Sequence, residues 1–371
     1  MATSPDGGAE RRTIVLVYGG RSAEHDVSCV SARAVLAAAS AAGFEVRPVA
    51  VGRDGVWRAP EGLDPTDGLL TDGLPTDGLP TDGIPVAASV ALTADDAGHG
   101  DPGIVVFPLV HGPLGEDGTL SGLCELVDVP YVGCGVLSSA LCMDKAMAKR
   151  VTTEAGLPQA RHLALGPHHP LDTDAVFDAL GASVFVKPAN MGSSVGVTRA
   201  VDAAALVDAV ALARTYDEWV VVEEEVTGRE IECAVLGAAG SARASVPGEV
   251  IAGAEFYDYA DKYLRGVART EVPADLDPDT TAEAQRLALA AFDALRCEGM
   301  ARVDFFLCPE RGLLLNEVNT VPGFTPISMY PSMWAASGLD LPGLVAELVR
   351  LAVDRHARRP RRTDPGAPPA G

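Results

Sequence analysis

The chain has 371 residues, which is too long for one ordinary domain and indicates two or three. Hydrophobic residues make up 47% of it and charged residues 22%, the balance of a folded, soluble protein rather than a disordered or fibrous one. Its 29 basic residues are outnumbered by 51 acidic ones, giving a formal net charge of −22. Because so acidic a surface repels phosphate backbones and anionic lipids, we expect neither nucleic acid nor a membrane among the partners.

The cysteines and the first residues of the chain indicate in which cellular compartment the protein is expected. The seven cysteines contain no CxxC pair and lie mostly in apolar runs, which predicts buried, reduced thiols and a cytoplasmic protein. The chain begins with acidic residues and glycines ahead of a strand-like run, so we expect no signal peptide. No apolar stretch approaches the roughly 18 residues of a membrane span.

The first 155 residues alternate strand and helix patterns. The apolar run 13–18 ends at Gly19-Gly20, and a helical pattern follows from about 27 to 42. Further strand-like runs at 44–51 and 103–110 precede helical patterns at 118–127 and 137–155. This alternation predicts an α/β domain with a doubly wound parallel sheet and helices on both faces.

Two segments do not fit this pattern of strands and helices. Residues 66–85 consist of four pentads, TDGLL, TDGLP, TDGLP and TDGIP, which are rich in turn residues and hold little apolar bulk, so we expect a mobile surface insertion. Residues 355–371 are rich in proline and arginine, and we expect a disordered tail.

From about residue 157 onward the pattern becomes α+β. Strand-like runs lie at 182–186, 219–224, 230–236, 300–307 and 312–318, and amphipathic helices lie near 202–214 and 280–295. The last two runs form a predicted hairpin with its turn at 309–312.

Alternation along this hairpin groups four polar side chains. Arg302 and Asp304 share one face of the first strand, and Glu317 and Asn319 share one face of the second. The oxygen atoms of Asp304, Glu317 and Asn319 are ligands suited to Mg²⁺. A surface network between Arg302 and the carboxylates is the alternative, and the hairpin alone does not decide between them.

Lysine is rare in this chain. Of the 29 basic residues only Lys145, Lys149, Lys187 and Lys262 are lysines, so a compact positive charge has been used in few places. Lys187 ends a strand and precedes a Gly- and Ser-rich loop, 188–196, whose backbone N–H groups suit an anion. The loop is not a Walker loop, and an ordinary turn is the alternative.

Two further loops lie where α/β proteins bind ligands. Glu24 stands at a helix N-terminus after Gly19-Gly20, which predicts an anion site beside a carboxylate. His111 and Glu116 follow a buried strand at its carboxyl end. A capped helix start and a plain loop are the respective alternatives.

Eight segments, in this order, resemble the D-alanine–D-alanine ligase family of the ATP-grasp superfamily: GGRSAEHDVS, HGPLGEDGT, MDK, VKPANMGSSVGV, EEEVTGRE, FYDYADKYL, ARVDFFL and NEVNTVPGFTPIS. The resemblance runs from about Ile14 to Val353 and leaves out the pentads and the termini. It implies an ATP-grasp fold of three subdomains: 1–137, with the insertion 66–85; 138–222; and 223–354, with a lid loop at 249–269.

The resemblance also implies a nucleotide and metal site. The positions that match ATP contacts are Lys145, Lys187 and Lys262 for the phosphates, Glu223 and Val226 for adenine, and Glu230 for the ribose. The positions that match the ligands of two Mg²⁺ ions, for which Mn²⁺ can substitute, are Asp304, Glu317 and Asn319, in agreement with the strand-face argument.

The positions that match substrate contacts form a second set. Glu24 matches the carboxylate facing the ammonium of the first D-alanine, in a region lined by His111 and Glu116, with Ser193 and Tyr263 as its hydrogen-bonding partners. The oxyanion donors are matched by Arg302 and the backbone of Gly323, and the contacts to the second D-alanine carboxylate by Ser328 and Met329. Many relatives carry Leu in place of Met329.

The activity implied is ADP-forming ligation of two D-alanines through a D-alanyl phosphate, in a cytoplasmic homodimer that serves peptidoglycan synthesis. A ligase of the same fold that joins D-alanine to D-lactate or D-serine is one alternative, and Tyr263 in an intact FYDYADKY loop argues against the lactate version. A catalytically inactive nucleotide-binding regulator is another, and the presence of the lysine and metal positions argues against it.

Overall fold

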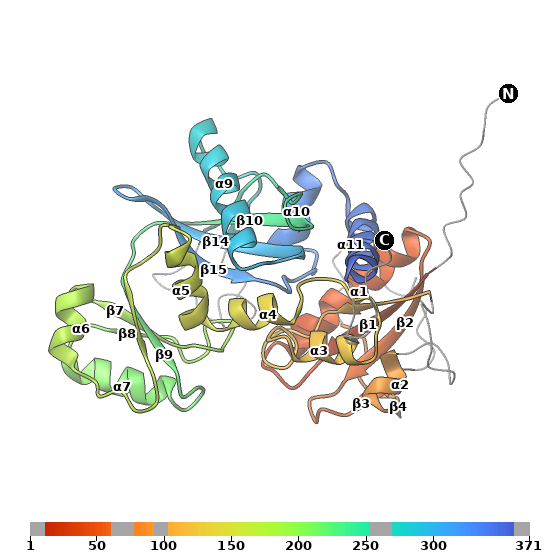
Figure 1. Ribbon diagram of the computed structural model, residues 1–371, viewed down its shortest axis with the longest axis horizontal. Helices are drawn as coiled ribbons and strands as arrows, with labels where there is room; N and C mark the ends of the chain where they lie inside the picture. The colour runs from red at the N-terminus through yellow and green to blue at the C-terminus, as the bar shows by residue number, and fades with distance from the viewer. Residues whose placement is uncertain (1–11, 61–77, 93–102, 252–268, 360–371) are drawn as a thin grey trace, which may run out of the picture.

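The computed structural model describes residues 12–60, 78–92, 103–251 and 269–359. Three β-sheets form the frame of the molecule, and each carries its own helices (Figure 1). Their strand orders are β4-β3-β2-β1-β5, β6-β9-β7-β8 and β13-β12-β10-β14-β15, with β11 paired to β10. In these described ranges no helix is long and apolar enough to cross a bilayer.

The N-terminal sheet is parallel at its centre, as predicted. Strands β1 (Thr13–Gly19), β2 (Glu45–Val51) and β5 (Ile104–Pro108) run parallel, while β3 (Trp57–Ala59) and β4 (Ile84–Pro85) add an antiparallel edge. Side chains 14–18 of β1 are fully buried because helices cover both faces. The helices here are α1 (His25–Ala41), α2 (Ala88–Leu92) and α3 (Thr119–Leu126).

The central sheet is antiparallel, and one of its faces is covered by helices. It contains β6 (His162–Leu165), β7 (Val184–Pro188), β8 (Thr198–Ala200) and β9 (Val220–Glu224). Its apolar face packs on α6 (Thr173–Leu180) and α7 (Ala203–Ala213). The chain enters this sheet through α4 (Val136–Met143) and α5 (Lys145–Glu154), and the small apolar contact beneath α5 includes Ala146 and Val221.

The C-terminal sheet holds the predicted hairpin. Strands β14 (Gly299–Cys308) and β15 (Gly312–Asn319) pair antiparallel, and β10 (Arg229–Gly237), β11 (Arg243–Ala244), β12 (Gly248–Ile251) and β13 (Arg269–Glu271) extend the sheet. Helix α9 (Pro278–Ala294) packs on the apolar face. On the opposite face of this sheet, β10 contacts α10 (Met329–Ala336), and β10 and β14 contact α11 (Leu341–Arg358). Helix α11 also packs on α1.

The expectation of a mobile insertion at 66–85 is wrong for residues 78–85. Leu79 is 4% exposed and belongs to the core that contains β1 and α1. The hydroxyl of Tyr18 donates to the carbonyl of Pro80 at 2.5 Å, and Ile84-Pro85 forms the edge strand β4. One or two aliphatic side chains per pentad are little apolar bulk, but the buried side chain of Leu79 anchors this end of the segment. Residues 66–77 lie outside the described residues.

The expectation of a disordered tail from residue 355 is wrong for residues 355–359. Helix α11 continues to Arg358, and the Arg355 side chain is buried. It donates to the carbonyls of Gly133 and Tyr131 and lies 4.1 Å from the centre of the Tyr131 ring. These contacts satisfy the buried guanidinium and order the last turns; residues 360–371 lie outside the described residues.

The cysteines behave as their apolar surroundings predict. All seven are free thiols; six are buried and Cys308 is half-buried.

Candidate active site

The N-terminus of α1 is fixed against the ends of β1 and β5. Gly19 has a φ of +90°, and a Cβ there would lie 2.3 Å from the carbonyl oxygen of Val51, so only glycine fits this turn. The Ser28 hydroxyl accepts from the Gly19 N–H and donates to the Leu109 carbonyl at 2.6 Å. This network holds Glu24, the N-cap residue of α1, at the carboxyl edge of the parallel sheet.

Glu24 and Ser193 meet although 169 residues separate them. The Ser193 hydroxyl donates to Glu24 Oε1 at 2.5 Å. Ser193 and Ser194 have φ values of 50° and 58°, so the loop after β7 holds two non-glycine residues in a left-handed conformation. The second carboxylate oxygen lies close to the backbones of Gly112 and Gly192, where an added Cβ would be 3.3 and 3.2 Å away. The Glu24 carboxylate thus has the backbones of Gly112 and Gly192 close to one of its oxygens.

His111 and Glu116 form a buried pair beside Glu24. His111 Nδ1 donates to the carbonyl of Val321 at 3.0 Å and lies 3.5 Å from Glu116 Oε1, while Nε2 has no hydrogen-bond partner in the described part of the chain. Burial lowers the pKa of His111, but the hydrogen bond and charge of Glu116, with Glu24 behind it, outweigh burial and raise it. Burial raises the pKa of Glu116.

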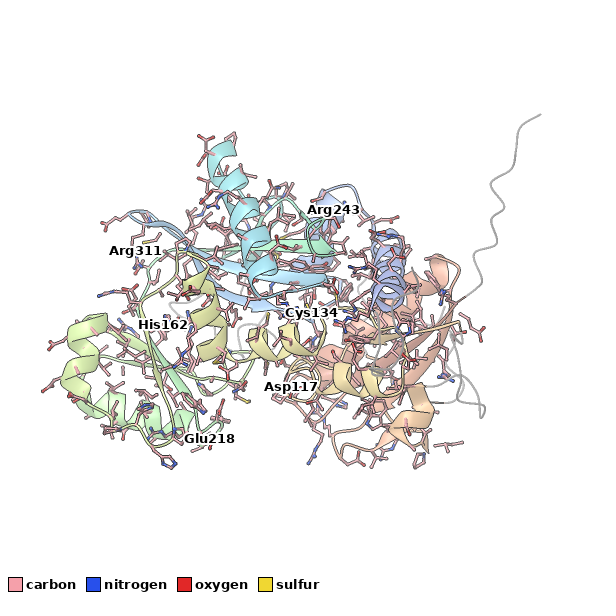
Figure 2. The ribbon with its side chains drawn as sticks, in the orientation of Figure 1. Asp117, Cys134, His162, Glu218, Arg243 and Arg311 are labelled. Carbon is pink, nitrogen blue, oxygen red and sulfur yellow. The ribbon has the colours of Figure 1, made fainter. Side chains whose placement is uncertain are left out.

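Glu223 in β9 is shared by two lysines. Lys187 Nζ lies 3.1 Å from Glu223 Oε2, and Lys149 Nζ lies 3.3 Å from Oε1. Burial alone would raise the pKa of Glu223, but the two ammonium groups bring it down to about 2. His162 on β6 is the cross-strand neighbour of Glu223, and Figure 2 shows it beside α5, the helix that carries Lys149.

The hairpin presents its polar side chains as the sequence predicts. Arg302 is the cross-strand neighbour of Asn319, and Asp304 is that of Glu317. The intervening Val303 and Val318, with Phe305, point into the core beneath α9. The alternation argument is confirmed for this face.

Arg302 neutralises carboxylates on two strands. It donates to both oxygens of Asp304, at 2.8 and 2.7 Å, and its Nε lies 3.1 Å from Glu232 on β10. Burial would lower the pKa of Arg302, but these carboxylates raise it well above its usual value. The sequence left open whether Arg302 forms an ion-pair network with the carboxylates. The structure contains this network, which is largely buried rather than at the surface.

The same face offers hard oxygen donors. Asp304 and Glu317 are direct neighbours, and Asn319 Oδ1, which accepts from the Val321 N–H at 3.0 Å, lies one pair further along. No three His, Cys, Asp or Glu side chains are grouped to hold a metal within the described ranges. Two carboxylates and a carboxamide fit Mg²⁺ nonetheless, since that ion takes few protein ligands and keeps water and phosphate oxygens.

Lys145 links three parts of the site. Its Nζ donates to the carbonyl of Met191 in the loop after β7 at 2.5 Å and lies 4.0 Å from Glu317 Oε2. The hairpin turn makes another link, because Arg311, labelled in Figure 2, donates to Glu224 of β9 at 2.7 Å. The central and C-terminal sheets are joined at both ends.

The loop after β15 returns toward α1. The Phe324 N–H donates to Ser31 of that helix at 3.1 Å. Ser328, the N-cap residue of α10, hydrogen-bonds Thr325 at 2.7 Å, and its hydroxyl would lie 2.8 Å from a Cβ at Gly323. Met329 is buried with its terminal methyl against Gly248, so its side chain belongs to the core.

The remaining predicted residues fall into two groups. Val226 and Glu230 are half-buried on the connection from β9 to β10 and at the start of β10, and Glu230 is on the same face of that strand as Glu232. Lys262 and Tyr263, with most of the predicted lid, lie outside the described residues.

Sequence reasoning missed two residues of the site. Lys149 follows Lys145 by four positions, the spacing that places two side chains on one helix face, in a chain with only four lysines. Glu232 follows Glu230 by two positions on a strand and so shares its face. Both signals were present in the sequence.

This arrangement suits a reaction between an anion-rich ligand and an amino group. Three lysines, an arginine and a Gly- and Ser-rich loop lie around a face of carboxylates, and Glu24 with Ser193 offers an acceptor pair at one end.

The comparisons with known proteins agree over most of the chain. Residues 13–134 match the family model described as the D-ala D-ala ligase N-terminus, and residues 151–350 match the one described as the D-ala D-ala ligase C-terminus. A protein of Mycolicibacterium vanbaalenii named D-alanine–D-alanine ligase is 45% identical, over 93% of this chain and 98% of the relative. One of Acetivibrio thermocellus with the same name is 41% identical, over 94% and 97%.

Solved structures give the same result. The D-alanine–D-alanine ligase of Coxiella burnetii has a TM-score of 0.75 and 35% identity, and covers 93% of this chain and 96% of its own. The VanG D-Ala:D-Ser ligase of Enterococcus faecalis has a TM-score of 0.74 and 30% identity, over 92% of this chain and 100% of its own. These ligases have the ATP-grasp fold, so the predicted fold is confirmed.

Proposed function

Because the chain belongs to the D-alanine–D-alanine ligase family, we propose that it joins two D-alanines into D-alanyl-D-alanine with conversion of ATP to ADP and phosphate. The contact between Glu24 and Ser193 carries the proposal. It places a carboxylate and a hydroxyl at the end of the parallel sheet, beside the backbones of Gly112 and Gly192. Such a pair suits the ammonium of a small amino acid.

The first step activates a carboxylate. The family uses ATP, and we propose that Lys145 and Lys187, with Lys262, bind its phosphates, while Glu223 and Val226 contact adenine and Glu230 the ribose. The γ-phosphoryl group passes to the carboxylate of the first D-alanine, held through its ammonium by Glu24, and a D-alanyl phosphate forms.

The second step forms the peptide bond. The amine of the second D-alanine, positioned through its carboxylate at Ser328 and the start of α10, attacks the acyl phosphate, and phosphate leaves. In this proposal Arg302 and the Gly323 N–H stabilise the oxyanion. Tyr263 is, with Ser193, a proposed hydrogen-bonding partner of Glu24.

A metal belongs to this proposal because the donor set fits it. Asp304, Glu317 and Asn319 would hold Mg²⁺, for which Mn²⁺ can substitute, and the ion would neutralise phosphate oxygens when bound. We further propose a cytoplasmic homodimer that serves peptidoglycan synthesis, with subdomain boundaries at 137/138, within α4, and at 222/223, within β9 of the central sheet.

The choice of second substrate deserves its own test because one structural relative is titled a D-Ala:D-Ser ligase. Phosphate release from ATP is measured with D-alanine alone and with D-alanine plus D-serine, D-lactate or L-alanine, and radiolabelled products are separated by thin-layer chromatography. We expect dipeptide of D-alanine almost exclusively. Predominant D-alanyl-D-serine or depsipeptide would overturn the substrate assignment, and ATP binding without D-alanine-dependent phosphate release would identify a regulator instead.

A further inference from the structure

The buried carboxylate of Glu223 has a different lysine at each oxygen. Oε1 lies 3.3 Å from Lys149 Nζ, and Oε2 lies 3.1 Å from Lys187 Nζ. The Glu223 side chain is 4% exposed, so both cations act on it at short range and away from water. Lys187 has a proposed task at the phosphates, whereas nothing in the proposed reaction uses Lys149.

The two lysines differ in their freedom to move. Lys149 projects from α5 toward the central sheet; its side chain is 4% exposed, and Nζ is buried with no hydrogen bond of regular geometry in the described part of the chain. Lys187 stands near the end of β7, is 15% exposed, and is followed by the Gly- and Ser-rich loop. Lys187 can therefore turn toward a ligand, and Lys149 has no comparable path away from Glu223.

This difference matters when a nucleotide binds. If Lys187 turns to the phosphates, Oε2 of Glu223 loses its cation, and a buried carboxylate without any counter-charge is strongly unfavourable. Lys149 remains at Oε1 and keeps Glu223 ionised. We propose that Lys149 is a positioning residue that selects adenine, because it holds Glu223 as an acceptor whose Oε2 receives the exocyclic amine after Lys187 has turned away. The inference rests on the proposed function and deepens it.

An ionised Glu223 discriminates by hydrogen-bond type. A carboxylate only accepts, so it favours the amine of adenine and disfavours the oxygen that guanine and hypoxanthine carry at the same position. The lysines that hold its pKa at about 2 make the anion the only form at neutral pH. The other charged groups acting on Lys149 are Lys187 and Glu317, and burial lowers its pKa.

Equilibrium binding tests the inference without any need for catalysis. Binding of ADP and of purine riboside diphosphate, which lacks the amine, is measured by calorimetry on the full chain with Mg²⁺. The wild type should prefer ADP by roughly ten-fold or more, the range of a hydrogen bond to a charged group. Lys149→Met should lose most of this preference, so that its affinity for ADP falls by more than its affinity for purine riboside diphosphate does.

The control is Arg150→Met, which removes the same charge from an exposed position next along α5 and should keep the preference. Lys149→Met leaves Glu223 less compensated, so a second pair of variants guards against misfolding. Glu223→Gln should reduce the preference, because a neutral amide oxygen is a weaker acceptor than a carboxylate. Lys149→Met added to Glu223→Gln should change the preference no further, since the carboxylate that Lys149 compensates is then absent.

Equal weakening of both diphosphates in Lys149→Met would show a merely structural role and overturn the inference. So would a further loss of preference in the double variant, or a wild type that binds both diphosphates equally. A chain that binds ADP selectively but forms no dipeptide would overturn the proposed function and leave this inference intact.

Discussion

Arg302 donates two hydrogen bonds to Asp304, two positions further along the same strand, at 2.8 and 2.7 Å. One of these residues is a proposed oxyanion donor and the other a proposed metal ligand. Strand alternation places both on the polar face, and their side chains then hold each other in position. The substitution of either residue therefore disturbs the other.

The first prediction concerns this pair. Arg302→Met leaves Asp304 and Glu232 buried without the guanidinium, so the free energy of unfolding should fall by about 3–5 kcal/mol. Arg286→Met is the control, because Arg286 pairs with Glu283 on the exposed side of α9 and its loss should cost about 1 kcal/mol or less. Urea unfolding measures both, and equal costs would contradict a special role for the buried pair.

The second prediction concerns the anchored end of the pentads. Leu79 is buried in the core with Tyr18 and Cys29, so Leu79→Ala should lower the free energy of unfolding by about 2–5 kcal/mol. Leu126 is 85% exposed, and Leu126→Ala should change it by no more than about 0.5 kcal/mol. If Leu79→Ala proved as mild as the control in urea unfolding, the packing of this segment would be refuted.

The third prediction concerns pH. The folded-state pKa of His111 is raised by Glu116 and Glu24 despite burial, so protonated His111 stabilises the fold. That stabilisation is complete below the unfolded pKa of about 6.5 and is lost as pH rises through the higher folded pKa. The difference in melting temperature between wild type and His111→Gln should therefore shrink from pH 6 toward alkaline pH.

Exposed His168 provides the control for this titration. The difference between wild type and His168→Gln should stay flat over the same pH range. A difference for His111→Gln that grows with pH would reverse the sign of the argument and show that burial dominates the electrostatics of this pair.

The hairpin could be predicted closely from the sequence because strict alternation fixes which side chains share a face. Alternation predicts that Arg302 shares a face with Asp304, and Glu317 with Asn319, but the pairing of Arg302 with Asn319 and of Asp304 with Glu317 depends on a β-bulge. The bulge at Asp304/Phe305 could not be foreseen, because it adds an extra residue that no local pattern marks.

Contacts between distant segments were beyond local patterns. The meeting of Lys149 with Glu223 depends on how α5 packs on the central sheet, and the burial of Leu79 depends on the packing of α1. The short helix α6 was not predicted, since eight residues give little periodicity and its start is set by the Asp172 cap. Glu24 and Ser193 were predicted to share one site only from the family resemblance, because their separation in the sequence does not indicate that they meet.

The last prediction concerns the polar face of the hairpin. The Glu317 side chain is 38% exposed and approaches Lys145 at 4.0 Å, so Glu317→Gln should change the free energy of unfolding by about 1 kcal/mol or less. If Glu317 is a ligand of Mg²⁺, the same change should weaken the neutralisation of phosphate charge, which contributes several kcal/mol, and slow ligation by more than about 100-fold. Glu310→Gln, in the exposed hairpin turn, should leave both quantities unchanged. Phosphate release titrated with Mg²⁺ and urea unfolding measure the two effects. A Glu317→Gln variant with the wild-type rate at limiting Mg²⁺ would remove this residue from the metal site, and one that unfolded at neutral pH would give it a structural role instead.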